Sequence, residues 1–262
     1  MPALMILLAC TATTTPPDDS TTSGDDSPTG DSPDSGAASL CSQGTGLAEG
    51  GSFHAVGDDS YWLFSPRDLP DCAPLLMFGH GGNNQGTVMN GMWTDMMQTG
   101  LLDQAQERGF VLMVPFLNEV EGPQEHYWEL GLEVQMQGFV ADAATQVDLD
   151  LARVRFAGTS AGGHMACYWG LFDPRGVTSV VVLSAGIGSY FDYPDTEPDP
   201  KLHFTVIHDP DDQVVPYSRS EQLVADLSAH GHEYVFESPD LGSNGHGWSP
   251  EATGIVLDSW PE

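Results

Sequence analysis

Short apolar runs alternate with longer amphipathic segments through most of this sequence. The apolar runs are rich in β-branched or aromatic residues and predict strands at 61–64, 75–78, 110–115, 154–157, 179–183, 203–208 and 234–236. The segments between them predict helices at 94–108, 133–147, 161–172, 220–229 and 252–260. Strands that alternate with helices predict an α/β fold with a mostly parallel sheet and helices on both of its faces.

The first ten residues depart from this pattern. Met1 to Cys10 is apolar and ends in Leu7-Leu8-Ala9-Cys10, which resembles the lipobox of bacterial lipoprotein signals. The stretch is too short to span a bilayer, and it departs from such signals because no Lys or Arg precedes its apolar part. The resemblance implies lipidation at Cys10 and export, either as a cell-envelope lipoprotein or as a secreted protein. A disordered apolar terminus is the alternative.

Residues 11–39 have a different composition from the rest of the chain. They are mainly Thr, Ser, Asp, Pro and Gly, with six Asp and no Lys or Arg. Such a segment buries too little apolar surface to order itself, so we expect a disordered acidic tether. The predicted organisation is a signal over 1–10, the tether over 11–39 and one globular domain over 40–262.

The charge of the chain excludes one class of function. Lys and Arg number 7 and Asp and Glu 38, which gives a formal net charge of −31. This balance leaves no basic surface for nucleic acid or anionic lipid, so nucleic-acid binding is excluded and membrane contact is expected only through a lipid at Cys10. One hypothesis is that the acidity suits salty or calcium-containing surroundings.

Three cysteines remain after Cys10. In an exported protein Cys41 and Cys72 are the expected disulfide pair, whereas in a reducing compartment both are expected to be free thiols. Cys167 falls inside a predicted helix and is expected to be a small buried apolar residue. No C-x-x-C pair suggests zinc or redox chemistry, and we expect no metal and no cofactor.

A glycine-rich break follows the run at 154–157. The sequence Gly158-Thr159-Ser160-Ala161-Gly162 matches G-x-S-x-G, with a predicted strand before it and a predicted helix after it. A nucleophilic serine needs this setting because a sharp strand-to-helix turn exposes its hydroxyl and only small neighbours fit around it. Ser160 is therefore the candidate nucleophile.

A serine nucleophile needs a base and an acid that orients the base. His246 is the expected base because it lies in the glycine-flanked loop Asn244-Gly245-His246-Gly247-Trp248. Four other histidines are weaker candidates: His164, His208, His230 and His232.

The expected acid is Asp212, with Asp211 as the second choice, in the cluster Asp209 to Asp212. That cluster is also compatible with a solvated turn or an oxygen-rich cation site, and these interpretations do not exclude one another.

A loop after the run at 75–78 supplies candidate oxyanion donors. It reads Gly79-His80-Gly81-Gly82, and its glycines allow the backbone to approach a substrate. The expected donors are the N–H of Ala161 and the N–H of Gly82 or Gly81.

These motifs together resemble one family. GHGGNNQ, the pair Tyr127-Trp128, Asp142, GTSAGGHMA, HDPDDQVVPY and NGHGW are similar to the polyhydroxybutyrate depolymerase and feruloyl esterase-like group of α/β-hydrolases, from about residue 75 to 248. The resemblance implies an α/β-hydrolase fold and a Ser160, Asp212 and His246 triad. The sequence departs from the group in its acidity and in a short segment at 188–200 that leaves little room for a lid domain.

The sequence therefore predicts a serine esterase that acts through an acyl-enzyme on a polyester or on feruloyl or acetyl esters of polysaccharides. His80, Trp128 and Trp248 are expected to contact the substrate, which is either small or polymeric. Other loop aromatic residues either line the pocket or pack in the core. The alternatives are a peptidase of the same fold and a non-catalytic surface lipoprotein that binds a polymer or glycan.

Overall fold

The computed structural model describes residues 41–44, 49–82, 96–116, 132–188, 191–196, 199–242 and 244–261. The expected lipobox, the tether and Trp128 lie outside these residues. None of the helices in the described ranges is long and apolar enough to cross a membrane.

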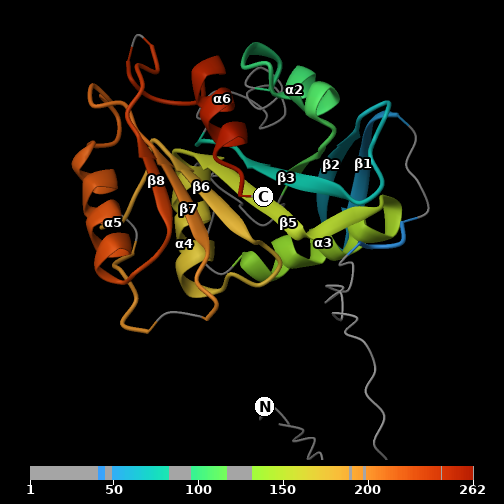
Figure 1. The fold of residues 1–262 in the computed structure, drawn as a ribbon, viewed down its shortest axis with the longest axis horizontal. Coiled ribbons are helices and arrows are strands. Elements are labelled where there is room, and N and C mark those ends of the chain that lie inside the picture. Colours follow the sequence, from blue (N-terminus) through green and yellow to red (C-terminus); the bar gives the residue numbers. More distant parts are fainter. Residues whose placement is uncertain are drawn as a thin grey trace, which may run out of the picture. The chain divides into compact units, whose positions relative to one another are not determined.

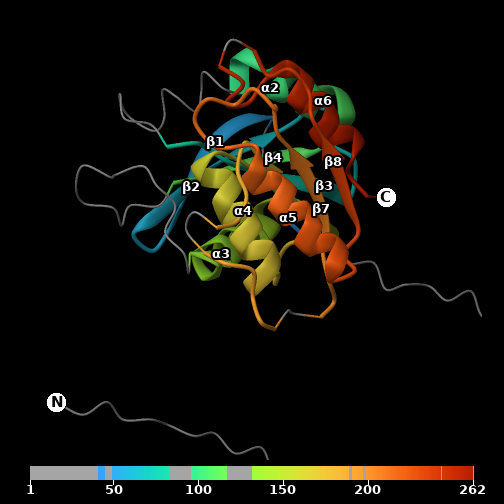
Figure 2. The ribbon, with the colours of Figure 1, turned by 90° about the vertical axis from the view of Figure 1, so that its left-hand side faces the viewer.

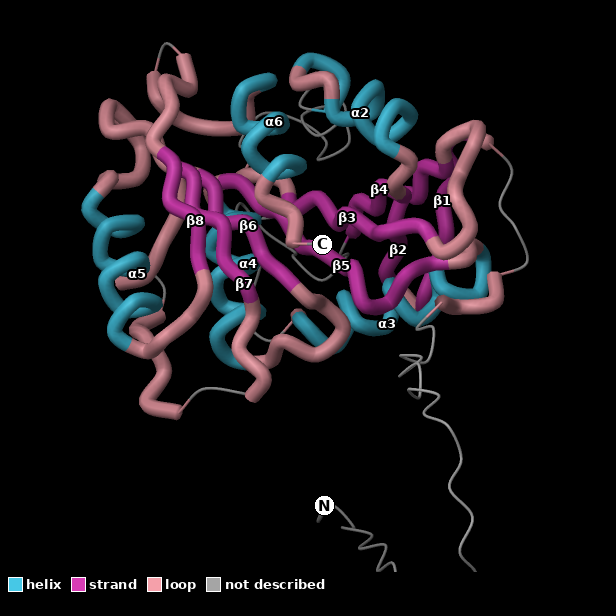
Figure 3. Tube along the Cα trace, viewed as in Figure 1, coloured by secondary structure: helices cyan, strands magenta, loops and turns pink. Residues whose placement is uncertain are grey.

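One sheet of eight strands runs through the described part of the chain (Figures 1 and 3). The strands are β1 (Gly50–Val56), β2 (Asp59–Ser65), β3 (Ala73–Gly79), β4 (Val111–Phe116), β5 (Leu149–Thr159), β6 (Ser179–Leu183), β7 (His203–Ile207) and β8 (Tyr234–Glu237). Their order is β1-β2-β4-β3-β5-β6-β7-β8, and only the pairs β1/β2 and β2/β4 are antiparallel. The mostly parallel sheet is confirmed.

Helices cover both faces of the sheet, as predicted. On one face lie α3 (Glu133–Gln146), α4 (Ala161–Phe172) and α5 (Ser218–Ala229), and on the other lie α2 (Leu101–Arg108) and α6 (Pro250–Asp258) (Figures 1 and 2). Each face has its own buried cluster: Trp169 of α4 belongs to the first, and Val256 of α6 to the second. The apolar strands are buried on both sides because helices cover both sides.

Two elements differ from the sequence expectations. Strand β1 was not predicted, because its side chains alternate between exposed and half-buried and Phe53 is mostly exposed, so it has no apolar run. The helix expected over 94–108 is interrupted in its described part. Gly100 has a left-handed backbone with φ 72°, and α2 begins only after it.

The parallel strands bring four loops to one edge of the sheet. Gly79 pairs with Gly158, Thr159 with Leu183, and Leu183 with Ile207, so β3, β5, β6 and β7 end side by side. Gly81, Ser160 and Asp212 follow β3, β5 and β7, and His246 follows β8, which ends beside β7 because Ile207 pairs with Glu237. Loops outside the carboxyl ends of parallel strands are the usual place for a binding site in open α/β sheets.

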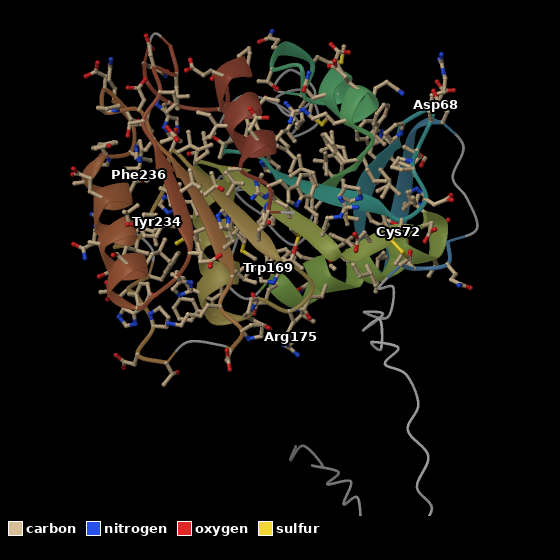
Figure 4. The ribbon with its side chains drawn as sticks, in the orientation of Figure 1. Asp68, Cys72, Trp169, Arg175, Tyr234 and Phe236 are labelled. Atoms are coloured by element: carbon tan, nitrogen blue, oxygen red, sulfur yellow. A yellow bond between two sulfur atoms is a disulfide. The ribbon has the colours of Figure 1, made fainter. Side chains whose placement is uncertain are left out.

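The predicted disulfide joins Cys41 and Cys72, whose Cα atoms are 5.2 Å apart (Figure 4). It ties the segment before β1 to the segment before β3. Ser42 strengthens the attachment, because its Oγ donates to Val147 O at 2.9 Å and accepts from Leu149 N at 2.8 Å. Cys167 is buried and free, also as expected.

Candidate active site

Ser160 occupies the turn between β5 and α4. Its backbone has φ 53° and ψ −115°, a conformation that non-glycine residues rarely adopt. Its N–H donates to Leu183 O at 2.9 Å, which fixes the turn to the end of β6. A strained serine at a strand-to-helix turn is the geometry of a nucleophile elbow.

Glycines allow this turn to pack tightly. A Cβ on Gly158 would lie 2.0 Å from Gly162 O, and a Cβ on Gly162 would lie 2.3 Å from Gly79 O. Gly162 N also donates to His80 O at 3.1 Å. The elbow therefore rests directly on the segment that follows β3, and side chains at these glycines would separate the two.

The expected oxyanion donors lie around the elbow. A Cβ on Gly81 would be 3.4 Å from Ser160 Cβ, so Gly81 lies against Ser160. Ala161 is the first residue of α4, where backbone N–H groups have no partner inside the helix. Gly82 is the last described residue of its segment, and its part in an oxyanion hole stays a prediction. His80 lies in the same segment, with Nδ1 2.8 Å from Gly81 O.

Asp212 is held from two sides in a turn after β7. Its side chain is fully buried. Oδ1 accepts the N–H groups of Val214 and Val215 at 2.8 and 2.9 Å. Oδ2 lies 2.8 Å from Nδ1 of His246 and 3.0 Å from Nε2 of His208. Such donors fix the orientation of the carboxylate.

The loop that carries His246 is docked against the same edge. Gly245 has φ +64°, and a Cβ there would lie 2.7 Å from the backbone of Asp211, so only glycine fits. Gly247 N donates to Ser184 Oγ at 3.3 Å. Ser184 follows Leu183, which accepts the N–H of Ser160. Two consecutive residues at the end of β6 therefore hold the elbow and the histidine loop.

The other histidines take different places. His164 Nδ1 donates to Gly186 O at 2.8 Å, and burial lowers the pKa of its ring. His230 packs its ring on Tyr193, and His232 bonds Leu202 O at 3.3 Å. His208 also lies in the site, where its Nε2 faces Oδ2 of Asp212. Sequence reasoning recognised His208 only as a weaker base candidate, although its position at a strand end beside the acids was the available signal.

The acidic cluster after β7 builds a turn. Asp209 accepts the N–H groups of Asp211 and Leu241 at 2.8 and 2.7 Å, while Asp211 is exposed. Asp212 rather than Asp211 therefore faces His246, and its part as the orienting acid stays a prediction. Within the described ranges, no group of three or more His, Cys, Asp or Glu side chains is arranged to hold a metal ion.

Of the expected substrate contacts, Trp248 packs on the core. Its ring meets Phe78 edge-on at 5.0 Å, and its indole N–H donates to Thr253 Oγ1 at 2.7 Å. This N–H is therefore occupied, and any contact with substrate would involve the ring. Whether Trp248 and His80 touch substrate stays a prediction.

Several solved structures with a similar fold are hydrolases by name. A thermostable esterase superposes with a TM-score of 0.53 at 22% identity, covering 79% of this chain and 59% of that one. An esterase of the Planctomycetes species Thermogutta terrifontis superposes with a TM-score of 0.58 at 14% identity, covering 80% of this chain and 90% of that one. The fluorophosphonate-binding serine hydrolase F of Staphylococcus aureus superposes with a TM-score of 0.57 at 13% identity, covering 81% of this chain and 100% of that one.

A dipeptidyl aminopeptidase IV-like protein of Bacteroides ovatus superposes with a TM-score of 0.58 at 15% identity, covering 80% of this chain and 35% of that one. The chain thus spans less than two thirds of the length of this protein and of the thermostable esterase. No family model matches the chain, and no curated protein matches it. At these identities the similarities establish the fold, which is that of α/β-hydrolases.

Proposed function

We propose that the protein is a serine hydrolase that cleaves carboxylic esters through an acyl-enzyme. One observation carries the proposal: consecutive residues at the end of β6 hold a strained serine elbow and the loop of His246, which lies 2.8 Å from the buried Asp212. Ser160, His246 and Asp212 have the roles of nucleophile, base and orienting acid in this proposal.

Each group has a defined task in the proposed reaction. Nδ1 of His246 carries a proton toward Asp212, so Nε2 is the nitrogen that accepts the proton of Ser160 Oγ. Oγ attacks the ester carbonyl, and the N–H groups of Ala161 and of Gly81 or Gly82 stabilise the oxyanion. His246 then gives the proton to the leaving alcohol. Water repeats the sequence and releases the acid.

The substrate is proposed at a finer level from the sequence resemblance. We infer a polyester or a feruloyl or acetyl ester of a polysaccharide, met outside the cell by a protein anchored through Cys10. Growth with labelled palmitate tests the anchor: the full chain should be labelled, and Cys10→Ser should abolish the label. An unlabelled wild-type chain contradicts lipidation but leaves the hydrolase proposal standing.

A fluorophosphonate probe and p-nitrophenyl acetate test the chemistry. The wild type should react with the probe and hydrolyse the ester, and Ser160→Ala should do neither, whereas Ser228→Ala, at an exposed position of α5, should behave as the wild type. Hydrolysis that survives in Ser160→Ala would overturn the proposal. A folded wild type that the probe does not label points to the binding protein instead, and preference for dipeptide reporters points to a peptidase.

A further inference from the structure

The hydrogen bonds of a second histidine define a further role in this site. His208 directly follows β7 and is completely buried. Its Nε2 lies 3.0 Å from Asp212 Oδ2 and 3.1 Å from Val215 O. A carboxylate and a carbonyl oxygen only accept hydrogen bonds, so Nε2 must carry a proton.

The opposite side of the ring meets a hydroxyl. Nδ1 of His208 lies 2.6 Å from Ser220 Oγ, and Ser220 Oγ lies 2.6 Å from Ala185 O. The carbonyl of Ala185 only accepts, so the single hydroxyl proton of Ser220 is donated to it. Oγ of Ser220 therefore faces Nδ1 as an acceptor for a proton on that nitrogen.

Burial favours the neutral ring. It is the largest influence on His208 and lowers its pKa, and nearby His246 acts in the same direction. Asp212 and the carbonyl of Val215 oppose this shift. The other titratable groups around the ring are His164 of α4 and Tyr217, whose ring packs edge-on at 5.5 Å.

We propose that His208 is a positioning residue of the triad, which holds Oδ2 of Asp212 with its Nε2–H. The role rests on the proposed hydrolase function, whereas the proton on Nε2 does not. Oδ2 then receives two imidazole N–H groups, one from His208 and one from the base. With Oδ2 fixed in this way, the carboxylate is held in position to stabilise the protonated His246 that forms in the reaction.

Nitrogen-15 NMR of the wild-type imidazole rings tests the proton on Nε2 without substrate or variants. At neutral pH we expect His208 to carry a proton on Nε2. A ring protonated only at Nδ1 would overturn the proposal, because a bare Nε2 would then face two acceptors. This measurement stands even if the protein hydrolyses no ester.

Kinetics of three variants test the role. His208→Leu removes the donor and should lower kcat about 10- to 100-fold with little change in KM, as expected for a lost hydrogen bond to a charged group. The acidic limb of kcat/KM should move to higher pH, because Asp212 keeps more negative charge to stabilise protonated His246. His208→Gln replaces the ring with an amide donor of similar reach and should recover most of the rate and the original limb.

His203→Leu makes the same change at the other end of β7 and should leave the profile unmoved. Equal losses in His208→Leu and His208→Gln at every pH, with no shift of the limb, would reduce His208 to a packing residue. If the wild type shows no hydrolysis that depends on Ser160, the hydrolase proposal is refuted instead. The NMR result then tells whether the proposal for His208 fails as well.

Discussion

Asp212 and His246 lie 34 positions apart in the chain, yet Oδ2 of the first is 2.8 Å from Nδ1 of the second. The contact is made by a carboxylate that is fully buried, while the neighbouring Asp211 points to solvent. The turn after β7 therefore selects one acid from a run of similar side chains. Burial and four donors make this carboxylate the one that can orient a base.

Replacing that carboxylate should remove most activity. An amide in Asp212→Asn would offer N–H as well as C=O to Nδ1 and could hold His246 in the wrong tautomer. In a chymotrypsin-type triad the equivalent change costs about 10⁴-fold in kcat, and we expect a loss of that order. Asp211→Asn, the exposed neighbour, is the control and should keep wild-type kcat/KM on p-nitrophenyl acetate. Equal effects of the two changes would contradict the assignment.

The elbow should not tolerate a methyl group at Gly162. Its Cβ would lie 2.3 Å from Gly79 O, so Gly162→Ala must displace the segment that carries Gly81. We expect a loss of at least 1–3 kcal/mol of unfolding free energy from overpacking, together with most of the activity. Urea unfolding and ester hydrolysis measure the two effects.

Gly254→Ala is the matched control. This glycine lies in α6 with no heavy atom within 4 Å of a Cβ, so the change should stabilise the helix by about 0.5–1 kcal/mol and leave activity unchanged. If both glycine variants behave alike, tight packing at the elbow is not the cause.

A buried arginine should be important for stability. Arg155 of β5 donates to the carbonyl of Val256, to Ser259 O at 2.7 Å and to Ser179 Oγ at 2.9 Å, so it caps the end of α6. Burial lowers the pKa of this guanidinium to about 9. Arg155→Met removes these donors, which leaves Val256 O with only the longer bond from Ser259 Oγ at 3.4 Å, and we expect it to cost about 1–3 kcal/mol in urea unfolding.

Arg67→Met provides the comparison for that experiment. Arg67 pairs with Glu49 at 2.9 Å on the surface, where solvent screens the interaction. The variant should unfold at nearly the same urea concentration as the wild type. A larger effect at Arg67 than at Arg155 would show that surface pairing, rather than capping of α6, carries the stability.

Stability should fall on mild acidification. Burial lowers the pKa of His164, His203 and His208, so the unfolded chain binds protons that the folded chain resists. Their contribution is complete above the unfolded histidine pKa of about 6.5 and is lost as the pH falls toward their folded pKa values. Urea midpoints from pH 7.5 to 5 at constant high salt should therefore decrease. A constant or rising midpoint would contradict this.

Most of the fold could be predicted from the apolar runs of the sequence. Strand β6 and helix α4 lie where the pattern placed them, because strands buried on both faces need continuous apolar residues and the helix contains no proline. Strand β1 was missed because only alternate positions are half-buried, and the break before α2 was missed because Gly100 is compatible with several backbone conformations.

Within the site, the sequence determined which residue types were available and in what order. G-x-S-x-G already required a turn around Ser160, since only small residues fit there, and His246 stood out by its flanking glycines. The tertiary structure decided that Asp212 rather than Asp211 faces His246, and that His208 contacts the same carboxylate. The physical reason is that neighbouring aspartates have the same local pattern. Only the packing of β7 beside β6 and β8 determines which side chain is buried and which donors meet it.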